Sequence, residues 1–280
     1  MKWKKKTDEE ILKTRIRQGV PYLSFSAFEK TGLVKHGFST RLGGVSSGVY
    51  SSMNLSFTSG DDKEDVAVNF RRMADALDVS PEDMVAPYQA HTVDIRRAGA
   101  DDRGKGVVTP KDEMPADGLM TDVPGVVLVT GHADCVPLFA LDPVHRAVAL
   151  SHSGWRGTVR RMGMHTVEAM KEAFGTEAED LIVGIGPSIC RDCYQVGEDV
   201  AAAVRDSFSK EDTGRIITAG EEKYHMDLWK ANEIIFREAG VSEENIHVTD
   251  ICTACNTDFL FSHRAMGGRR GGMAAFLCLK

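Results

Sequence analysis

The stretch at residues 132–158, HADCVPLFALDPVHRAVALSHSGWRGT, decides how this chain folds and where its chemistry lies. Two apolar runs, GVVLVTG before Cys135 and HRAVALS before His152, predict buried strands. They place a thiol and an imidazole at the edges of neighbouring strands. Such a pair can hold a metal ion, or it can act as a nucleophile with its base. The plain alternative is a packing cysteine and a satisfied core histidine.

The residues around this pair favour a functional site over plain packing. Asp134 directly precedes Cys135, and a charge at a strand end needs a partner. Serines and glycines surround His152, so the backbone there turns closely and offers many donors. Trp155 and Arg156 add a stacking surface and a donor suited to phosphate.

His91, in PYQAHTVDI, is a third candidate ligand. Gln89 lies two residues earlier, so in an extended segment both side chains face the same way. One cysteine and two histidines with an open fourth position form a known zinc arrangement. The wide separation along the chain argues against a zinc finger and fits a catalytic site built from several strands. Spacing alone leaves a structural histidine open.

Residues 40–54, TRLGGVSSGVYSSMN, predict a long loop rich in glycine and serine. Such a loop exposes backbone N–H groups, and Arg41 beside them suits an anion. The alternative is a solvated loop arginine.

The periodicity along the rest of the chain predicts an α+β fold in which helices cover a pair of sheets. Loops are expected over residues 99–115 as well as 40–54. Helices are expected over residues 1–19, 62–78, 158–174 and 227–239, the last capped by Asp227, with another beginning near Gly197. Strands are expected within residues 20–39, 84–87, 117–151, 181–185, 245–249 and 273–279.

Composition excludes several classes of protein. Of the 280 residues, 42% are hydrophobic, enough for a sizeable core, and the net charge of -7 argues against a broad nucleic-acid surface. No apolar run approaches the ~18 residues of a membrane span. The start MKWKKKTDEE lacks the apolar core of a secretory signal, so a cytoplasmic protein is expected. There the six cysteines would serve packing, metals or catalysis rather than disulfides.

Seven segments in order carry a resemblance to a known family: FSTRLGGVSSGVYSSMNLS, QAHTVDI, ADGLMTDVPGVVLVTGHADCVPLFALD, ALSHSGWRGT, GIGPSICRDCYQVG, HMDLWKAN and CTACNTDFLFSHRAMGGRRGGMAAF. Together they closely resemble the bacterial laccase-domain, YfiH-like proteins. That family is variously described as polyphenol oxidase, as purine nucleoside phosphorylase with adenosine deaminase activity, and as peptidoglycan editing factor. The pairing of ADC-x-P with HSGWRG is the most specific part.

The resemblance implies a fold and a set of site residues. The fold is an α/β/β/α sandwich related to bacterial cysteine-deamidase toxins, with one catalytic domain over residues 20–280 after a polar extension at 1–19. The implied metal ligands are His91, Cys135 and His152, with zinc as the expected ion and copper as an alternative. The implied pocket residues are Arg41, Asn54, Gln89, Asp117, Asp134, Ser153 and Arg156.

The leading hypothesis for function is a zinc-dependent purine nucleoside phosphorylase that also deaminates adenosine. Its partners would be a nucleoside (adenosine, inosine or methylthioadenosine) and phosphate, with no obligate protein partner. The alternative is a metal-free hydrolase or amidase that edits muramyl precursors, with Cys135 as nucleophile and His152 as base. A copper oxidase is disfavoured because the nine histidines include no His-x-His.

Three features depart from the family or stand beside it. Near the C-terminus the family commonly reads TGRM, whereas here Gly272 precedes the methionine, so Arg269 or Arg270 could take the missing arginine's place. His132 stands where a small or apolar residue is common. Two C-x-x-C pairs at residues 190–193 and 252–255 could bind a structural zinc, although packing thiols are favoured, since the family does not require a second metal.

Overall fold

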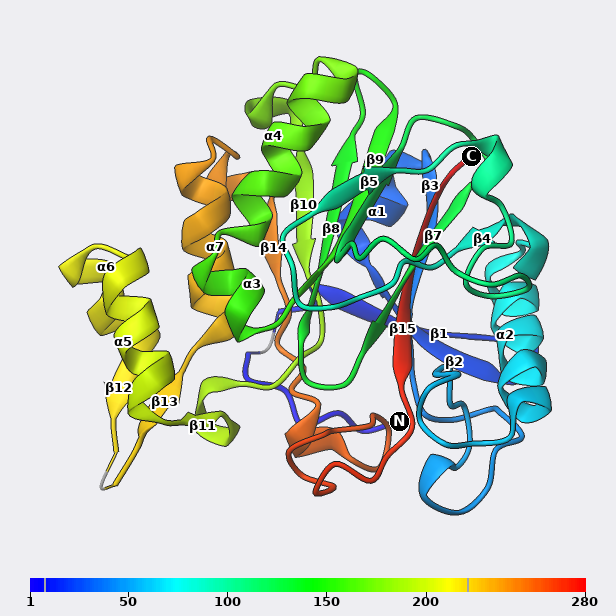
Figure 1. Ribbon diagram of the computed structural model, residues 1–280, viewed down its shortest axis with the longest axis horizontal. Coiled ribbons are helices and arrows are strands. Elements are labelled where there is room, and N and C mark those ends of the chain that lie inside the picture. The colour runs from blue at the N-terminus through cyan, green and yellow to red at the C-terminus, as the bar shows by residue number, and fades with distance from the viewer. Residues whose placement is uncertain (8, 221) are drawn as a thin grey trace.

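Two six-stranded sheets lie face to face at the centre of the molecule (Figure 1). The computed structural model describes residues 1–7, 9–220 and 222–280. The first sheet has the order β1 (Leu12–Arg17), β2 (Val20–Phe25), β3 (Val34–Ser39), β15 (Met273–Leu279), β7 (Val127–His132) and β4 (Met84–Val85). The second has the order β14 (Ile246–Val248), β10 (Ile182–Ile185), β8 (Val136–Asp142), β9 (Ala147–Ser153), β6 (Gly118–Thr121) and β5 (Ile95–Arg97).

The chain changes sheets inside the stretch at residues 132–158. Strand β7 ends at His132 in the first sheet, and β8 begins at Val136 in the second. Cys135 therefore lies on the short connection between the two layers. Strands β8 and β9 then pair antiparallel, with Pro137 opposite His152. This register brings the residue after β9 back beside Cys135.

Both faces of β8 and β9 are buried, which explains their nearly continuous apolar sequence. Side chains alternate along each strand, so Phe139 and Leu141 face the first sheet. Leu138 and Ala140 face the helices on the other side. The ring of Phe139 meets that of Phe25 edge-on, with 5.4 Å between centroids, in the core between the sheets.

Helices cover the outer face of each sheet, which confirms the expected α/β/β/α sandwich (Figure 1). On the second sheet lie α3 (Trp155–Val159), α4 (Met162–Phe174) and α7 (Leu228–Glu238), and α5 (Glu198–Ser207) packs against α3 outside them. On the first lies α2 (Lys63–Leu77). The remaining helices are α1 (Ser26–Thr31) and α6 (Lys210–Ile216).

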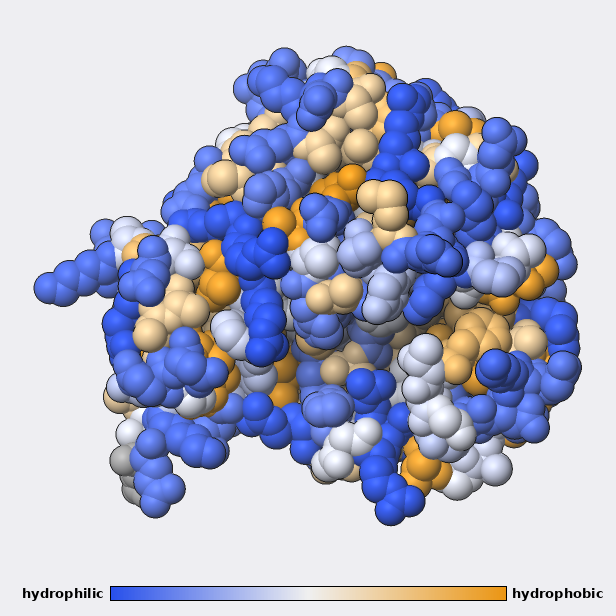
Figure 2. All heavy atoms as spheres, viewed as in Figure 1, coloured by the Kyte–Doolittle hydropathy of each residue, from blue (hydrophilic) through white to orange (hydrophobic). Residues whose placement is uncertain are grey.

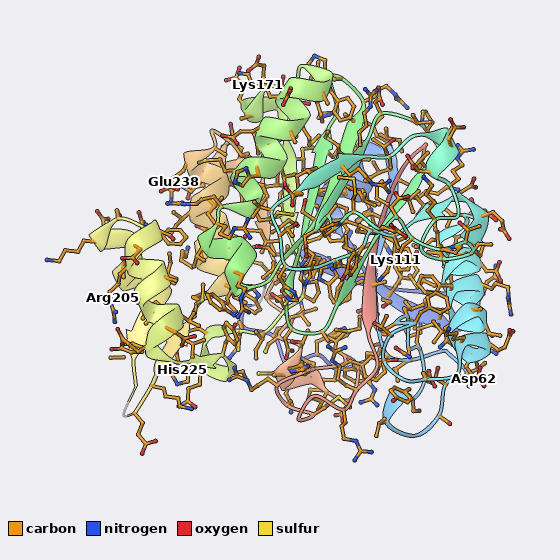
Figure 3. All side chains as sticks on the ribbon, in the orientation of Figure 1. Asp62, Lys111, Lys171, Arg205, His225 and Glu238 are labelled. Atoms are coloured by element: carbon orange, nitrogen blue, oxygen red, sulfur yellow. The ribbon has the colours of Figure 1, made fainter. Side chains whose placement is uncertain are left out.

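Helix ends agree with their local sequence. The Asp62 carboxylate accepts from the backbone of α2, and Asp227 caps α7 as expected. Lys171 lies in the last turn of α4, where a positive charge suits the helix dipole; Figure 3 labels both Asp62 and Lys171.

The expected N-terminal helix at residues 1–19 is wrong. Residue 8 lies outside the described residues, but Leu12–Arg17 form β1, which pairs with β2 across the expected boundary between residues 19 and 20. Gln18 and Gly19 both have positive φ, 49° and 79°, and make the tight hairpin turn. A small sheet of β11 (Gln195–Val196), β13 (Tyr224–Met226) and β12 (Ile217–Ala219) was also not expected.

Hydrophilic side chains cover most of the face in Figure 2, and apolar residues are scattered between them. Scattered apolar residues are normal on a protein surface. Within the described ranges, no helix combines the length and the apolar character needed to cross a membrane.

Candidate active site

Three side chains from separate parts of the chain converge at one edge of the sandwich. One donor atom each from His91, Cys135 and His152 lies within 4.8 Å of the other two. Cys135 comes from the connection between the sheets, His152 from the end of β9, and His91 from the loop between β4 and β5. The structure therefore brings together all three expected ligands.

The carboxylate of Asp117, fully buried, positions both histidines. One of its oxygens accepts from Nδ1 of His152 at 2.8 Å. The other accepts from the backbone N–H groups of Ala90 and Thr92, at 2.9 and 2.8 Å, on either side of His91. Since Nδ1 of His152 is engaged, Nε2 is the nitrogen left free to bind a metal.

The backbone of His91 is in the left-handed region, with φ of 58°. Few residues with a side chain adopt this conformation, and it costs about 1–3 kcal/mol when it occurs. The two bonds from its neighbours to Asp117 hold the segment in place. As a result, a ring nitrogen of His91, like one of His152, lies within 4.8 Å of the Cys135 sulfur.

Gly154 leaves space for the Cys135 sulfur and the His91 ring. A Cβ at this position would lie 3.0 Å from the Cys135 sulfur and 3.2 Å from Cδ2 of His91. A side chain at this position would therefore crowd the sulfur and the His91 ring. A set of two imidazole nitrogens and one sulfur, with one histidine braced by a carboxylate, matches the donors that zinc prefers. The residues present thus fit a zinc ion with an open coordination position.

In the metal-free protein, the proton of the Cys135 thiol moves to the His152 imidazole. Burial alone would raise the pKa of Cys135, but His152 and His91 lower it to about 6. Burial alone would lower the pKa of His152, but Cys135 and Asp117 raise it to about 9. At neutral pH the site therefore holds a thiolate beside an imidazolium.

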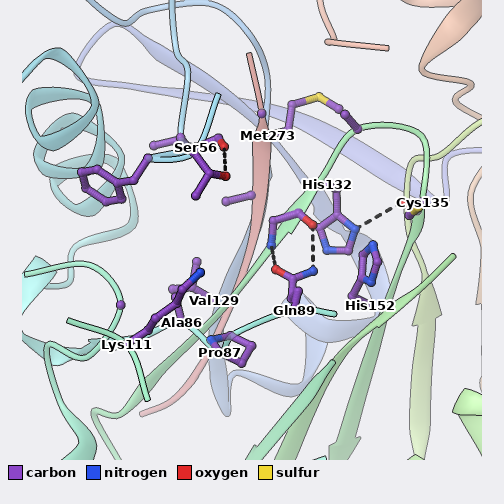
Figure 4. A pocket seen from close by; sticks show the side chains of 18 of the residues that line it. Ser56, Ala86, Pro87, Gln89, Lys111, Val129, His132, Cys135, His152 and Met273 are labelled. Atoms are coloured by element: carbon purple, nitrogen blue, oxygen red, sulfur yellow. Dashed lines mark hydrogen bonds between the residues drawn. The ribbon is translucent and has the colours of Figure 1, made fainter. Parts of the chain in front are cut away.

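His132 is a neutral member of the same site. Burial, then the charge of His152, holds its pKa well below the usual value. Its Nδ1 donates to the Cys135 carbonyl at 3.2 Å, and its Nε2 accepts from the Thr130 hydroxyl at 2.8 Å. This ring fixes the connection that carries Cys135, as Figure 4 shows.

A pocket of about 290 Å³ opens onto the three donors (Figure 4). This volume is at the lower end of the range for small-molecule sites. Its apolar wall includes Leu55, Phe70, Val129 and Met273. Its polar lining includes Ser56, Thr58, Gln89, Lys111, His132 and Arg270.

Comparison with known proteins places the chain in a family. The family model described as "Multi-copper polyphenol oxidoreductase laccase" matches residues 35–280. The chain belongs to this laccase-domain family.

Two relatives of this family member carry the names of nucleoside enzymes. "Purine nucleoside phosphorylase YlmD" of Geobacillus stearothermophilus is 36% identical over 242 residues, covering 86% of this chain and 88% of that protein. "Adenosine deaminase RL5", from an unknown prokaryotic organism, is 34% identical over 238 residues, covering 84% and 90%.

Solved structures of the family share the whole fold. YlmD from Geobacillus stearothermophilus superposes with a TM-score of 0.89 at 33% identity, covering 97% of this chain and 100% of that one. The Bacillus licheniformis protein YfiH gives a TM-score of 0.88 at 30% identity, covering 95% and 99%.

Two expected pocket residues of this laccase-domain protein hold the walls of the pocket. Gln89 lines it, but both ends of its amide bond the backbone of Gly131. Asn54 is fully buried, and both polar atoms of its side chain form hydrogen bonds within the protein. Its oxygen accepts from Ser56 and Gly272, and its nitrogen donates to Ser59 and Asp61.

Three other expected pocket residues lie outside the pocket lining. Both oxygens of Asp134 are engaged, by the Thr253 hydroxyl at 2.6 Å and the Arg264 N–H at 2.7 Å. Ser153 follows His152 on the strand and so faces the opposite side, where it bonds Thr158 and Asn232. The guanidinium of Arg156 stacks on the Trp155 ring, 4.3 Å from its centroid.

Arg41 lies in a different hollow of the surface, lined by residues such as Ser51 and Thr257. Its guanidinium donates to the carbonyls of those two residues and stacks over Phe261. The arginine that lines the pocket is Arg270, one of the two that the sequence offered in place of Gly272. Lys111, from a long polar loop, was missed because nothing local distinguishes it from a solvated lysine.

We expect Asp117→Asn to weaken zinc binding by roughly tenfold to a hundredfold, since the change removes the charge that orients His152 and one acceptor of the His91 loop. Competition with a chromophoric chelator measures the change in affinity. Asp122→Asn, at an exposed ion pair with Arg97, is the control. Unchanged affinity in Asp117→Asn would contradict the role assigned to this carboxylate.

The lowered pKa of Cys135 predicts the pH dependence of its alkylation. In metal-free protein, iodoacetamide modification of Cys135 should be half-maximal near pH 6, because thiolate forms above the pKa of about 6 and disappears below it. Peptide mass spectrometry resolves this cysteine from the other five, and added zinc should protect it. A half-maximal rate at pH 8 or above would refute the thiolate–imidazolium pair.

Proposed function

We propose that this protein is a zinc-dependent purine nucleoside phosphorylase that also deaminates adenosine. Its substrates would be adenosine, inosine or methylthioadenosine together with phosphate. The names of its relatives support this class of activity. The observation that carries the proposal is the side chain of Arg270, which lines the same pocket as the three donors. Its Nε is buried and has no hydrogen-bond partner among the described residues.

A buried guanidinium N–H without a partner is costly, and an anion in the pocket would satisfy it. Arg270 is tethered at its other nitrogens by the Gly271 carbonyl and the His263 ring, at 3.1 and 3.5 Å. Its position is therefore fixed before a ligand arrives. Lys111 lines the same pocket and brings a second positive charge. Together these groups suit a phosphate ion.

The apolar part of the pocket lining suits a nucleoside. Leu55, Phe70 and Val129 form an apolar surface against which a flat purine ring can pack. Ser56 and Thr58 line the pocket beside them and offer hydroxyls to a ribose. The pocket thus combines one apolar wall, a few hydroxyls and an anion subsite.

His91, Cys135 and His152 would hold the metal ion. When bound there, zinc would supply a Lewis acid that polarises an oxygen ligand and lowers the pKa of a water molecule. Asp117 keeps His152 in the tautomer that presents Nε2, and His132 keeps the Cys135 connection in place. Copper could occupy the same donors, since imidazole and thiolate also bind it.

In phosphorolysis, a phosphate oxygen forms a bond to C1′ while the bond from C1′ to the purine breaks. The base leaves with the electron pair and takes up a proton, and ribose 1-phosphate remains. Arg270 contributes by holding the phosphate against the sugar, since fixed orientation lowers the barrier. In deamination, a water oxygen replaces the amino group at C6 of adenine and ammonia leaves.

A second candidate function has one specific observation in its favour. Asp117 hydrogen-bonds His152, and the His152 ring lies beside the Cys135 sulfur, as in the catalytic set of a thiol hydrolase. A pKa of about 6 keeps that sulfur ionised at neutral pH. This arrangement would suit an amidase acting on muramyl precursors. It gives no role to His91, whose unusual backbone conformation is held in place so that its ring reaches the sulfur. The metal site explains all three donors and is therefore preferred.

Polyphenol oxidation by several copper ions finds less support in the donor set. Within the described residues, the only cluster of potential ligands that includes histidine is the one at Cys135, with two histidines. Coupled reduction of oxygen needs further metal centres, each with its own ligands.

The proposal predicts the products of a defined reaction. Protein purified and analysed for zinc, incubated with adenosine and phosphate, should release adenine and ribose 1-phosphate, with inosine as a second product. Cys135→Ala should lose the metal ion held by His91, Cys135 and His152, and with it the turnover. Chromatography of the reaction mixture measures these products. Absence of phosphate-dependent turnover in zinc-loaded protein, or an acyl-enzyme at Cys135 with a muramyl substrate, would contradict the proposal.

Arg270→Gln should raise the KM for phosphate by roughly tenfold to a hundredfold, because a charged hydrogen bond contributes about 1.5–3 kcal/mol. The KM for the nucleoside should change much less. Initial rates at varied phosphate measure the effect, and Arg269→Gln, at the exposed neighbour, is the matched control. Equal effects of the two substitutions would rule out an anion subsite at Arg270.

A further inference from the structure

We propose that Cys190, Cys193, Cys252 and Cys255 bind a structural zinc ion. The four sulfur atoms lie within 4.8 Å of one another, and they form a group separate from the one at Cys135. The two C-x-x-C pairs are far apart in the sequence but adjacent in the fold. Four cysteines in two such pairs are a common ligand set of structural zinc sites.

The spacing of the sulfurs matches one small ion. Zinc binds thiolate sulfur at about 2.3 Å, so the sulfurs of a tetrahedral site lie about 3.8 Å apart. The sulfurs of Cys193 and Cys255 are 3.5 Å apart, close to that separation. Small adjustments of side-chain torsions would therefore complete the tetrahedron.

Pairing between the flanking segments brings the two cysteine pairs together. Strands β10 and β14 run parallel, and the chain continues from both into a contact between Ser188 and Cys252. Short 3-10 turns follow, at Arg191–Cys193 and Ala254–Asn256. Both cysteine pairs therefore lie on tight turns that face each other.

The backbone also supports thiolates at this position. The N–H of Cys190 donates to the sulfur of Cys252 at 3.2 Å. Bonds of this kind orient and stabilise the sulfur ligands of a metal. Cys190 and Cys252 are buried, and Cys193 and Cys255 are half-buried, so the site is shielded from solvent but within reach of it.

Convergence distinguishes this cluster from ordinary packing. A free cysteine in a core behaves as a small apolar side chain and has no reason to meet three others. Here the sulfurs of all four cysteines converge between the two 3-10 turns. Apolar side chains would be enough to fill that space. All four are free thiols in the structure.

Hydrogen bonds to Asp134 link the cluster to the candidate active site. Ile189, next to Cys190, donates its N–H to the carbonyl of Asp134 at 3.0 Å. Thr253, next to Cys252, donates its hydroxyl to the Asp134 carboxylate at 2.6 Å. Asp134 has φ of 85° and precedes Cys135. A zinc ion would thus fix both segments that hold Asp134 in this conformation.

Metal content tests the proposal without reference to the reaction. Wild-type protein prepared without added metal should contain one more zinc per chain than Cys193→Ser or Cys255→Ser, whatever the occupancy at Cys135. Cys278→Ser, at a buried cysteine outside the cluster, is the matched control and should keep the wild-type content. Cys255→His, which supplies a nitrogen ligand in place of sulfur, should restore the zinc.

A second measurement covers the case in which the serine variants fail to fold. Cys135→Ala protein, which keeps the four-cysteine cluster, should release one zinc when a mercurial reagent titrates its thiols, and cobalt loading should give charge-transfer bands of a tetrathiolate site. Equal zinc content in wild type and serine variants, iron in place of zinc, or a Cys193–Cys255 disulfide without bound metal would each overturn the proposal. Any of these results leaves the proposed phosphorylase activity untouched.

Discussion

The carboxylate of Asp117 is the constraint on which the candidate active site depends. It has no exposure to solvent, and a buried charge without partners would cost several kcal/mol. Three N–H groups satisfy it, one from the His152 ring and two from the backbone around His91. The backbone carbonyl of Asp117 also accepts from the backbone N–H of His152, at 2.7 Å. The charge is therefore stable only when β9 and the His91 loop are both in place.

The change of sheets at Cys135 has a related effect. The cysteine lies between β7 of the first sheet and β8 of the second, while His152 belongs to the second sheet alone. Packing of Phe25 against Phe139 holds the two layers together. The distance between sulfur and imidazole thus depends on the core as well as on local hydrogen bonds.

Much of the fold could be predicted from the sequence, because the apolar runs around residues 127–153 are long and buried on both faces. The N-terminal strand could not be predicted, because Leu12 is its only buried residue and one residue gives no periodicity. The turn at Gln18 and Gly19 was the one local signal for a hairpin there. For the site, motif resemblance found the three donors. It did not find that Ser153 faces away, although strand alternation predicts this. Nor could it separate Arg41 from Arg270, because their positions depend on the folding of distant loops.

The three donors differ in their access to solvent: His91 is exposed, Cys135 is partly buried, and His152 is buried. A metal ion arriving from solution would therefore meet the His91 imidazole first and the Cys135–His152 pair afterwards. Exchange of a bound ion with solvent would therefore depend on the His91 loop. The lifetime of a bound metal would thus depend on a surface loop as well as on the core.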